Sequence, residues 1–176
     1  MQSATELPIP DLEDKRILAL DLGMRTGWCY GENGGYVDSG VHMLYDHKAK
    51  DFTDGQRFKA FYDFLTNYMH ADVIVFEQVA GGTKGRQTVL FNGYRATLLL
   101  FCSITGKPCL PLAVGTIKKF ITGRGNASKE EMIDSIRAMG IPTFDDNEAD
   151  AVGAFHTALT LSEQQKVIAR IRGERE

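Results

Sequence analysis

The sequence predicts an α/β fold in which a mixed five-stranded sheet is flanked by helices. Three short strand-like segments come first, and strand-like and helical segments then alternate along the chain. Consecutive strands favour an antiparallel meander, whereas alternation with helices favours parallel strands added to the same sheet. The 176 residues suit one domain that needs no disulfide support. We expect a flexible N-terminal tail over residues 1–15 and a single domain over residues 16–170.

The first three strands are predicted from apolar runs and from the turn between them. Residues 16–22 (RILALDL) form a short apolar run that ends before Gly23, which predicts a buried strand. Residues 27–31 and 36–44 are predicted as two more strands, because the turn-forming sequence ENGG separates them.

Helices and strands alternate in the rest of the chain. Thr53, followed three residues later by Gln56, is a capping box that predicts a helix over residues 54–69. The run DVIVFEQ predicts a buried strand at 72–78. Periodicity, a second capping box and glycine positions predict four more helices and one strand: helices at 88–105, 116–121, Ser128 through Met139 and 147–169, and a strand at 108–114.

Charge is distributed unevenly along the chain. The formal net charge of −3 by itself argues against a nucleic-acid partner. However, residues 78–129 carry eight of the 20 Lys and Arg residues and none of the 23 Asp and Glu residues. A segregated basic segment of this kind favours phosphate binding, and the alternative is a set of solvated helix faces that lack acids.

The cysteines and the hydropathy indicate the cellular compartment in which the protein works. The three cysteines, Cys29, Cys102 and Cys109, have no C-x-x-C spacing, which argues against a zinc site and favours a reducing compartment. No apolar run reaches the length of a membrane span, and the N-terminus has no signal-peptide pattern. We therefore expect a cytoplasmic protein.

Three acidic residues occupy positions where α/β proteins build their sites. Asp21 and Glu77 end the first and fourth predicted strands, and Asp150 lies in the first turns of the last helix. Close carboxylates repel one another unless a cation neutralises them, and hard oxygen ligands suit Mg²⁺ or Mn²⁺. Two such ions ~3.5–4 Å apart can support phosphodiester hydrolysis without a protein nucleophile. Taken singly, each acid could instead close a turn, form an ion pair or complement a helix N-terminus.

The ordered motifs resemble a known family. LDLG at 20–23 with Thr26 and Gly27, FEQV at 76–79 and EADA at 148–151 are similar to the motifs of RuvC-type Holliday junction resolvases, especially their phage relatives, in the ribonuclease H-like superfamily. Residues 116–129 resemble the lysine-bearing segment of that family. The resemblance implies a ribonuclease H-like fold and a homodimeric endonuclease that makes paired nicks in four-way DNA junctions with Mg²⁺ or Mn²⁺.

The resemblance also implies roles for single residues. It places metal ligation on Asp21, Glu77 and Asp150. The family usually has a fourth ligand, Asp or His, one turn before the last Asp, and that position here is Asn147. The neighbouring Asp146 is the alternative fourth ligand. Lysines at positions that match those of the family imply contacts with phosphates. Lys118 is the candidate catalytic lysine, although a place on a solvated short helix would also explain why a lysine stands there. The expected DNA-binding residues are Lys84, Arg86, Arg95, Lys118, Lys119, Arg124 and Lys129.

One departure from the family keeps other functions open. Resolvases of this type often place an aromatic residue in the loop after the second acid, whereas residues 79–86 here read VAGGTKGR. A nuclease with broader branched-DNA or flap substrates is therefore an alternative, and so is a non-catalytic junction-binding protein. The helix at 88–105 matches a helix of the family's dimer interface, but its apolar residues would equally suit core packing.

Overall fold

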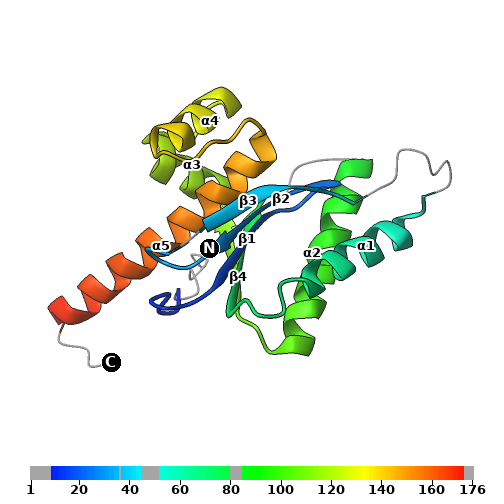
Figure 1. Cartoon of the computed structure of the whole chain (residues 1–176), viewed down its shortest axis with the longest axis horizontal. Coiled ribbons are helices and arrows are strands. Elements are labelled where there is room, and N and C mark those ends of the chain that lie inside the picture. The colour runs from blue at the N-terminus through cyan, green and yellow to red at the C-terminus, as the bar shows by residue number, and fades with distance from the viewer. Residues whose placement is uncertain (1–8, 36, 45–51, 80–84, 173–176) are drawn as a thin grey trace, which may run out of the picture.

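A computed structural model describes residues 9–35, 37–44, 52–79 and 85–172. Five strands form one sheet in the order β3-β2-β1-β4-β5 (Figure 1). The strands are β1 (Ile17–Asp21), β2 (Arg25–Gly31), β3 (Val37–Met43), β4 (Val73–Gln78) and β5 (Cys109–Ala113). The helices are α1 (Asp54–Thr66), α2 (Arg86–Thr105), α3 (Val114–Thr122), α4 (Lys129–Ala138) and α5 (Asp146–Arg172).

The sheet combines antiparallel and parallel pairing. Strands β1, β2 and β3 form the antiparallel meander, whereas β1 pairs in parallel with β4, and β4 pairs in parallel with β5. The predicted mixed five-stranded sheet is therefore confirmed. Each predicted element is present with ends shifted by three residues or fewer, and both capping boxes form at the starts of α1 and α4.

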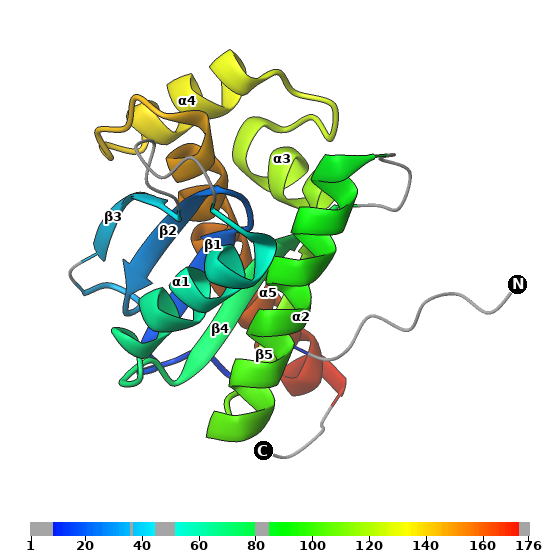
Figure 2. The same ribbon diagram turned by 90° about the vertical axis from the view of Figure 1, so that its right-hand side faces the viewer.

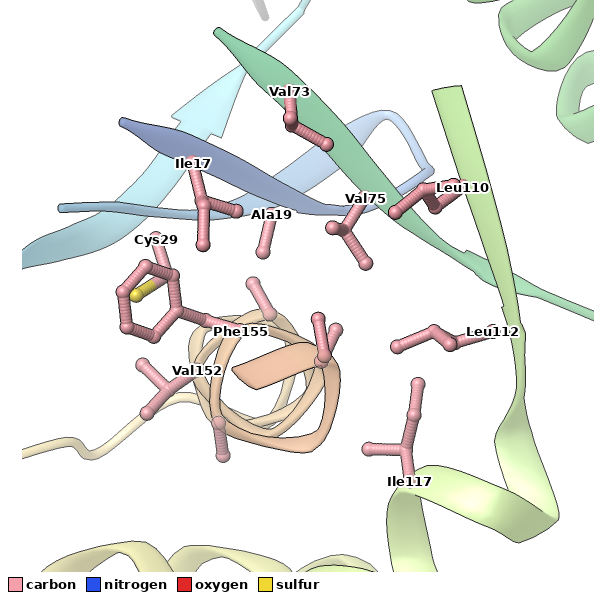
Figure 3. Close-up of a cluster of buried hydrophobic side chains, with 14 of the residues drawn as sticks. Ile17, Ala19, Cys29, Val73, Val75, Leu110, Leu112, Ile117, Val152 and Phe155 are labelled. Carbon is pink, nitrogen blue, oxygen red and sulfur yellow. The ribbon is translucent and has the colours of Figure 1, made fainter. Parts of the chain in front are cut away.

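Helices cover both faces of the sheet. Helices α1 and α2 pack on one face, and α5 packs on the other (Figures 1 and 2). Because strand side chains alternate between faces, Leu18 and Leu20 of β1 join the α1–α2 core. Ile17 and Ala19 instead face α5 and contribute to the core around Phe155 (Figure 3). Strand β1 is thus buried on both sides, which accounts for its continuous apolar run.

The segment before β1 packs against α5. Leu12 is buried, its backbone N–H donates a hydrogen bond of 3.0 Å to Ser162 Oγ, and Lys166 forms ion pairs with Asp11 and Glu13. The prediction of a flexible tail over residues 1–15 is therefore wrong for residues 9–15, because Leu12 is buried in the core beside α5. Residues 1–8 lie outside the described residues. None of the helices in the described ranges is long and apolar enough to cross a membrane.

Candidate active site

Asp21 and Glu77 lie on adjacent strands and face the same side of the sheet. Strand β1 pairs in parallel with β4, and the last paired residues are Leu20 and Phe76, directly before the two acids. Asp21 continues the alternation of Ile17 and Ala19, which face α5. Glu77 follows Val73 and Val75 on that same face. The sheet therefore presents both carboxylates toward α5, as the sequence predicted for neighbouring strands.

Helix α5 brings the third carboxylate to this face. Asp150 is flanked by Ala149 and Ala151, both fully buried against the sheet. At Gly27 of β2, a Cβ atom would lie only 1.9 Å from the backbone oxygen of Asn147. Gly27 on the strand and the alanines on the helix thus allow the first turn of α5 to lie directly on β2. This close approach positions Asp150 opposite the ends of β1 and β4.

Polar contacts tie the start of α5 to the sheet. Ser39 Oγ of β3 donates a hydrogen bond of 2.8 Å to Glu148, and Thr143 Oγ1 donates one of 2.7 Å to the same carboxylate. Arg25 at the start of β2 forms an ion pair with Asp145. Sequence reasoning missed all three residues: Ser39 and Arg25 lie far from α5 in the chain, and no local pattern marks Thr143 as a partner of Glu148.

Burial raises the pKa of each of the three carboxylates, and the charges of neighbouring acids add to the rise. Burial, followed by the charges of Glu77 and Asp150, raises the pKa of Asp21 well above its usual value. Burial and the charge of Asp150 raise the pKa of Glu77 to about 7, against the opposing effect of Lys118. Burial raises the pKa of Asp150 to about 6. No described residue donates a hydrogen bond to any of these carboxylates.

The oxygen atoms of these three carboxylates are chemically suited to bind a divalent cation. Carboxylate oxygens are among the hard ligands that Mg²⁺ and Mn²⁺ prefer, and no described hydrogen-bond donor occupies them here. Across the described ranges, however, no three His, Cys, Asp or Glu side chains are arranged as a metal-binding group. A bound ion would therefore rely on water for part of its coordination or would draw the side chains together, and Mg²⁺ commonly retains water ligands.

Comparisons with known proteins give a consistent result, although no family model matches the chain. The chain is 27% identical over 165 residues to the crossover junction endodeoxyribonuclease RuvC of Methylorubrum populi, covering 89% of this chain and 84% of that protein. It is also 27% identical over 169 residues to RuvC of Beijerinckia indica, covering 90% and 93% of the two chains. The chain is related to the RuvC-type resolvases. The resemblance drawn from the RuvC-type motifs is thereby confirmed.

Solved structures support the RuvC-type fold. Thermus thermophilus RuvC superposes with a TM-score of 0.66 at 14% identity, covering 86% of this chain and 96% of that one. The yeast mitochondrial Holliday junction resolvase Ydc2 superposes with a TM-score of 0.67 at 15% identity, covering 92% and 85%. These likenesses confirm the predicted ribonuclease H-like fold class.

Asp146 and Asn147 were the two residues predicted for a fourth position beside the acidic group. The charge of Asp146 raises the pKa of both Asp21 and Asp150, and Asp146 forms an ion pair with Lys129. The side-chain amide of Asn147 instead donates a hydrogen bond of 2.9 Å to Asp145. Asp146 is thus the electrostatically coupled member, one helical turn before Asp150.

Lys118 is the basic residue most clearly placed beside Glu77 and Asp150. Its charge lowers the pKa of Glu77 and of Asp150, and its Nζ donates a hydrogen bond of 2.6 Å to the backbone oxygen of Ala127. Lys129 also lies close enough to lower the pKa of Asp21 and Asp150. The structure therefore brings both predicted lysines to the acidic group.

The other predicted DNA-binding residues are more scattered. Lys119 is exposed on α3, and Arg124 forms an ion pair with Glu131 at the start of α4. Arg86 and Arg95 lie on α2, on the opposite face of the sheet from α5, and Arg86 forms an ion pair of 2.6 Å with Asp54. Lys84 lies outside the described residues.

Proposed function

We propose that the chain is a metal-dependent endodeoxyribonuclease that resolves four-way (Holliday) DNA junctions by paired phosphodiester nicks. The observation that carries this proposal is the group of Asp21, Glu77 and Asp150, which come from three elements, have pKa values raised by burial and by neighbouring acids, and lack hydrogen-bond donors among the described residues. The names of the related proteins, crossover junction endodeoxyribonucleases, support the choice of substrate.

The proposed cofactor is Mg²⁺ or Mn²⁺, with two ions at each site. Asp21, Glu77 and Asp150 would hold the ions, and Asp146 is the proposed fourth ligand in place of Asn147. When bound, ions of this kind supply positive charge that polarises a phosphate oxygen and acidifies water. Glu77 and Asp150, whose pKa values are about 7 and about 6, must lose their protons to act as ligands.

The lysines would act on the charge of the phosphate. A phosphodiester gathers negative charge as it is cleaved, and a fixed ammonium group stabilises that charge without moving. Lys118 is held by the Ala127 carbonyl and lies within electrostatic reach of Glu77 and Asp150, so we propose that it contacts the scissile phosphate. Lys119, Arg124 and Lys129 extend this positive surface over α3 and α4, and their contacts to DNA would weaken with salt.

The proposed active form is a homodimer, since paired nicks need two sites. The inner face of α2 packs on α1 through buried residues such as Tyr94 and Leu98. Four large apolar side chains of α2 remain exposed within the described part of the chain: Val89, Leu99, Leu100 and Ile104. A second copy of this chain packing on α2 would bury them. Sedimentation in the presence of junction DNA that gives only monomer would contradict this assembly.

The decisive experiment compares four substrates with the pure protein in Mg²⁺: a four-way junction, a flap, a Y-fork and plain duplex. We expect paired nicks in the four-way junction, and we expect Asp21→Asn to abolish cleavage while junction binding persists. Cleavage of all branched substrates at equal rates would favour the broader nuclease. Full activity of Asp21→Asn would remove the acidic site from the reaction.

A further inference from the structure

An aromatic side chain just before α5 is unusually exposed. Phe144 is 82% exposed, the highest value among the large apolar side chains of the described residues. It lies in the connection between α4 and α5, two residues before α5 begins. A phenylalanine that is this exposed contributes little to the stability of the fold through burial, so stability does not explain why a phenylalanine stands at this position.

The ring is held in place despite its exposure. The guanidinium carbon of Arg137 lies 4.6 Å from the ring centroid of Phe144, a cation–π contact. Arg137 Nε also donates a hydrogen bond of 2.7 Å to the backbone oxygen of Thr143. Thr143 itself is buried and donates to Glu148. Arg137 therefore fixes both the ring and the residue before it, while most of the ring surface stays open to solvent.

The backbone of Phe144 also lies near that of the acids on α5. The next residue, Asp145, forms an ion pair with Arg25, four positions after Asp21 in the chain. Asp146 and Asp150 are separated by about 6 Å along the helix axis, and two extended residues add at most about 7 Å. The backbone of Phe144 is therefore within about 13 Å of that of Asp150, which corresponds to about four nucleotide steps at 3.4 Å each.

We propose that Phe144, supported by Arg137, is a stacking platform for an unpaired nucleobase close to the cleaved phosphate. This inference rests on the proposed function, because it assumes DNA at the acidic group. Unpaired bases stack on aromatic rings and on guanidinium planes, whereas bases inside a duplex are already stacked on their neighbours. The platform would therefore engage DNA where strands separate, and it would favour branched over continuous duplex substrates.

Three substitutions test the platform in the full-length chain. Phe144→Tyr keeps a flat ring, Phe144→Leu keeps apolar bulk without one, and Ile171→Ala alters an 80% exposed side chain near the far end of α5. Binding to a four-way junction and to a single-stranded oligonucleotide is measured without divalent cation. We expect Phe144→Leu to weaken both by roughly 5- to 100-fold, as loss of one base stack implies. Phe144→Tyr and Ile171→Ala should bind like the unaltered chain.

A photocrosslink gives a second readout. Junctions with 5-iodouracil near the crossover should crosslink to the peptide that contains Phe144, and Phe144→Leu should lose this crosslink. Binding by Phe144→Leu within twofold of the unaltered chain, or crosslinks only to other aromatic residues, would overturn the platform. If the unaltered chain ignored four-way junctions but its binding to single strands still depended on Phe144, the proposed function would fail while the platform stood.

Discussion

The backbone oxygen of Asn147 approaches Gly27 so closely that a Cβ atom on Gly27 would lie 1.9 Å from it. Gly27 belongs to β2, and Asn147 lies in the first turn of α5. Because Asp150 follows one turn later, this contact sets the distance between the third carboxylate and the sheet. The activity of the chain should therefore depend on a glycine that carries no chemistry itself.

Gly27→Ala should displace the start of α5 and lower both stability and cleavage. An added methyl group that meets backbone cannot be relieved by a side-chain rotation, and overpacking of this kind costs about 1–3 kcal/mol. Chemical denaturation measures the loss, and single-turnover cleavage measures the effect on the site. Gly55→Ala in α1 is the control, because its nearest atom would lie at 4.0 Å and alanine favours helix. Equal stability of the two variants would contradict the packing argument.

Glu148 should act as a positioning residue for Asp150. Glu148→Ala would remove the acceptor for Ser39 and Thr143, and the loss of two hydrogen bonds to a charged group, at about 1.5–3 kcal/mol each, costs about 3–6 kcal/mol. Glu148→Gln keeps one oxygen acceptor and should recover much of the cleavage rate. The measurement is single-turnover cleavage at saturating protein with a parallel thermal melt. Glu148 would have no positioning role if Glu148→Ala cleaved normally.

Stability without divalent cation should fall as the pH rises from about 5 to 8. The folded chain holds protons on Glu77 and Asp150 up to pKa values of about 7 and about 6, whereas the unfolded chain releases them near pH 4. The folded state therefore binds more protons in this window, and the free energy of unfolding decreases with pH. Glu77 alone accounts for about 3 kcal/mol at 1.36 kcal/mol per pKa unit.

Mg²⁺ should offset this loss, because it binds the deprotonated carboxylates. Thermal melts from pH 5 to pH 8, in EDTA and in Mg²⁺, measure the effect. Glu77→Gln is the matched variant and should show both a flatter pH dependence and a smaller shift with Mg²⁺. Asp72, whose pKa is lowered by Arg16, titrates below this window and does not mask the trend. A melting temperature that rises toward pH 8 in EDTA would contradict the assignment.

Lys118→Ala should slow the cleavage step more than it weakens DNA binding. Removal of one fixed charge donor from a reacting centre commonly costs about 10²–10³ in rate. Lys119→Ala is the control, because its side chain is the exposed neighbour on the same helix. Single-turnover rates and junction affinities of both variants separate the two effects. Equal rates for the two variants would place Lys118 outside the reaction.

Much of the fold followed from local patterns. The continuous apolar run of Ile17, Leu18, Ala19 and Leu20 predicted a buried strand, and capping boxes at Thr53 and Ser128 predicted the starts of two helices. Asp21 and Glu77 were predicted at strand ends, and the parallel pairing of β1 with β4 places them side by side. These features depend on residues close in sequence or on a simple rule of strand order, so periodicity was sufficient to find them.

The sequence by itself thus determined the elements, their order and the three acids. Only the tertiary structure decided how α5 docks on Gly27, how Ser39 holds Glu148, and that Asp146 rather than Asn147 is coupled to Asp21. It also decided that Leu12 is buried and that Phe144 is exposed. The physical reason is that each of these depends on contacts, or on their absence, between segments far apart in the chain, and such contacts leave no periodic signal in the sequence.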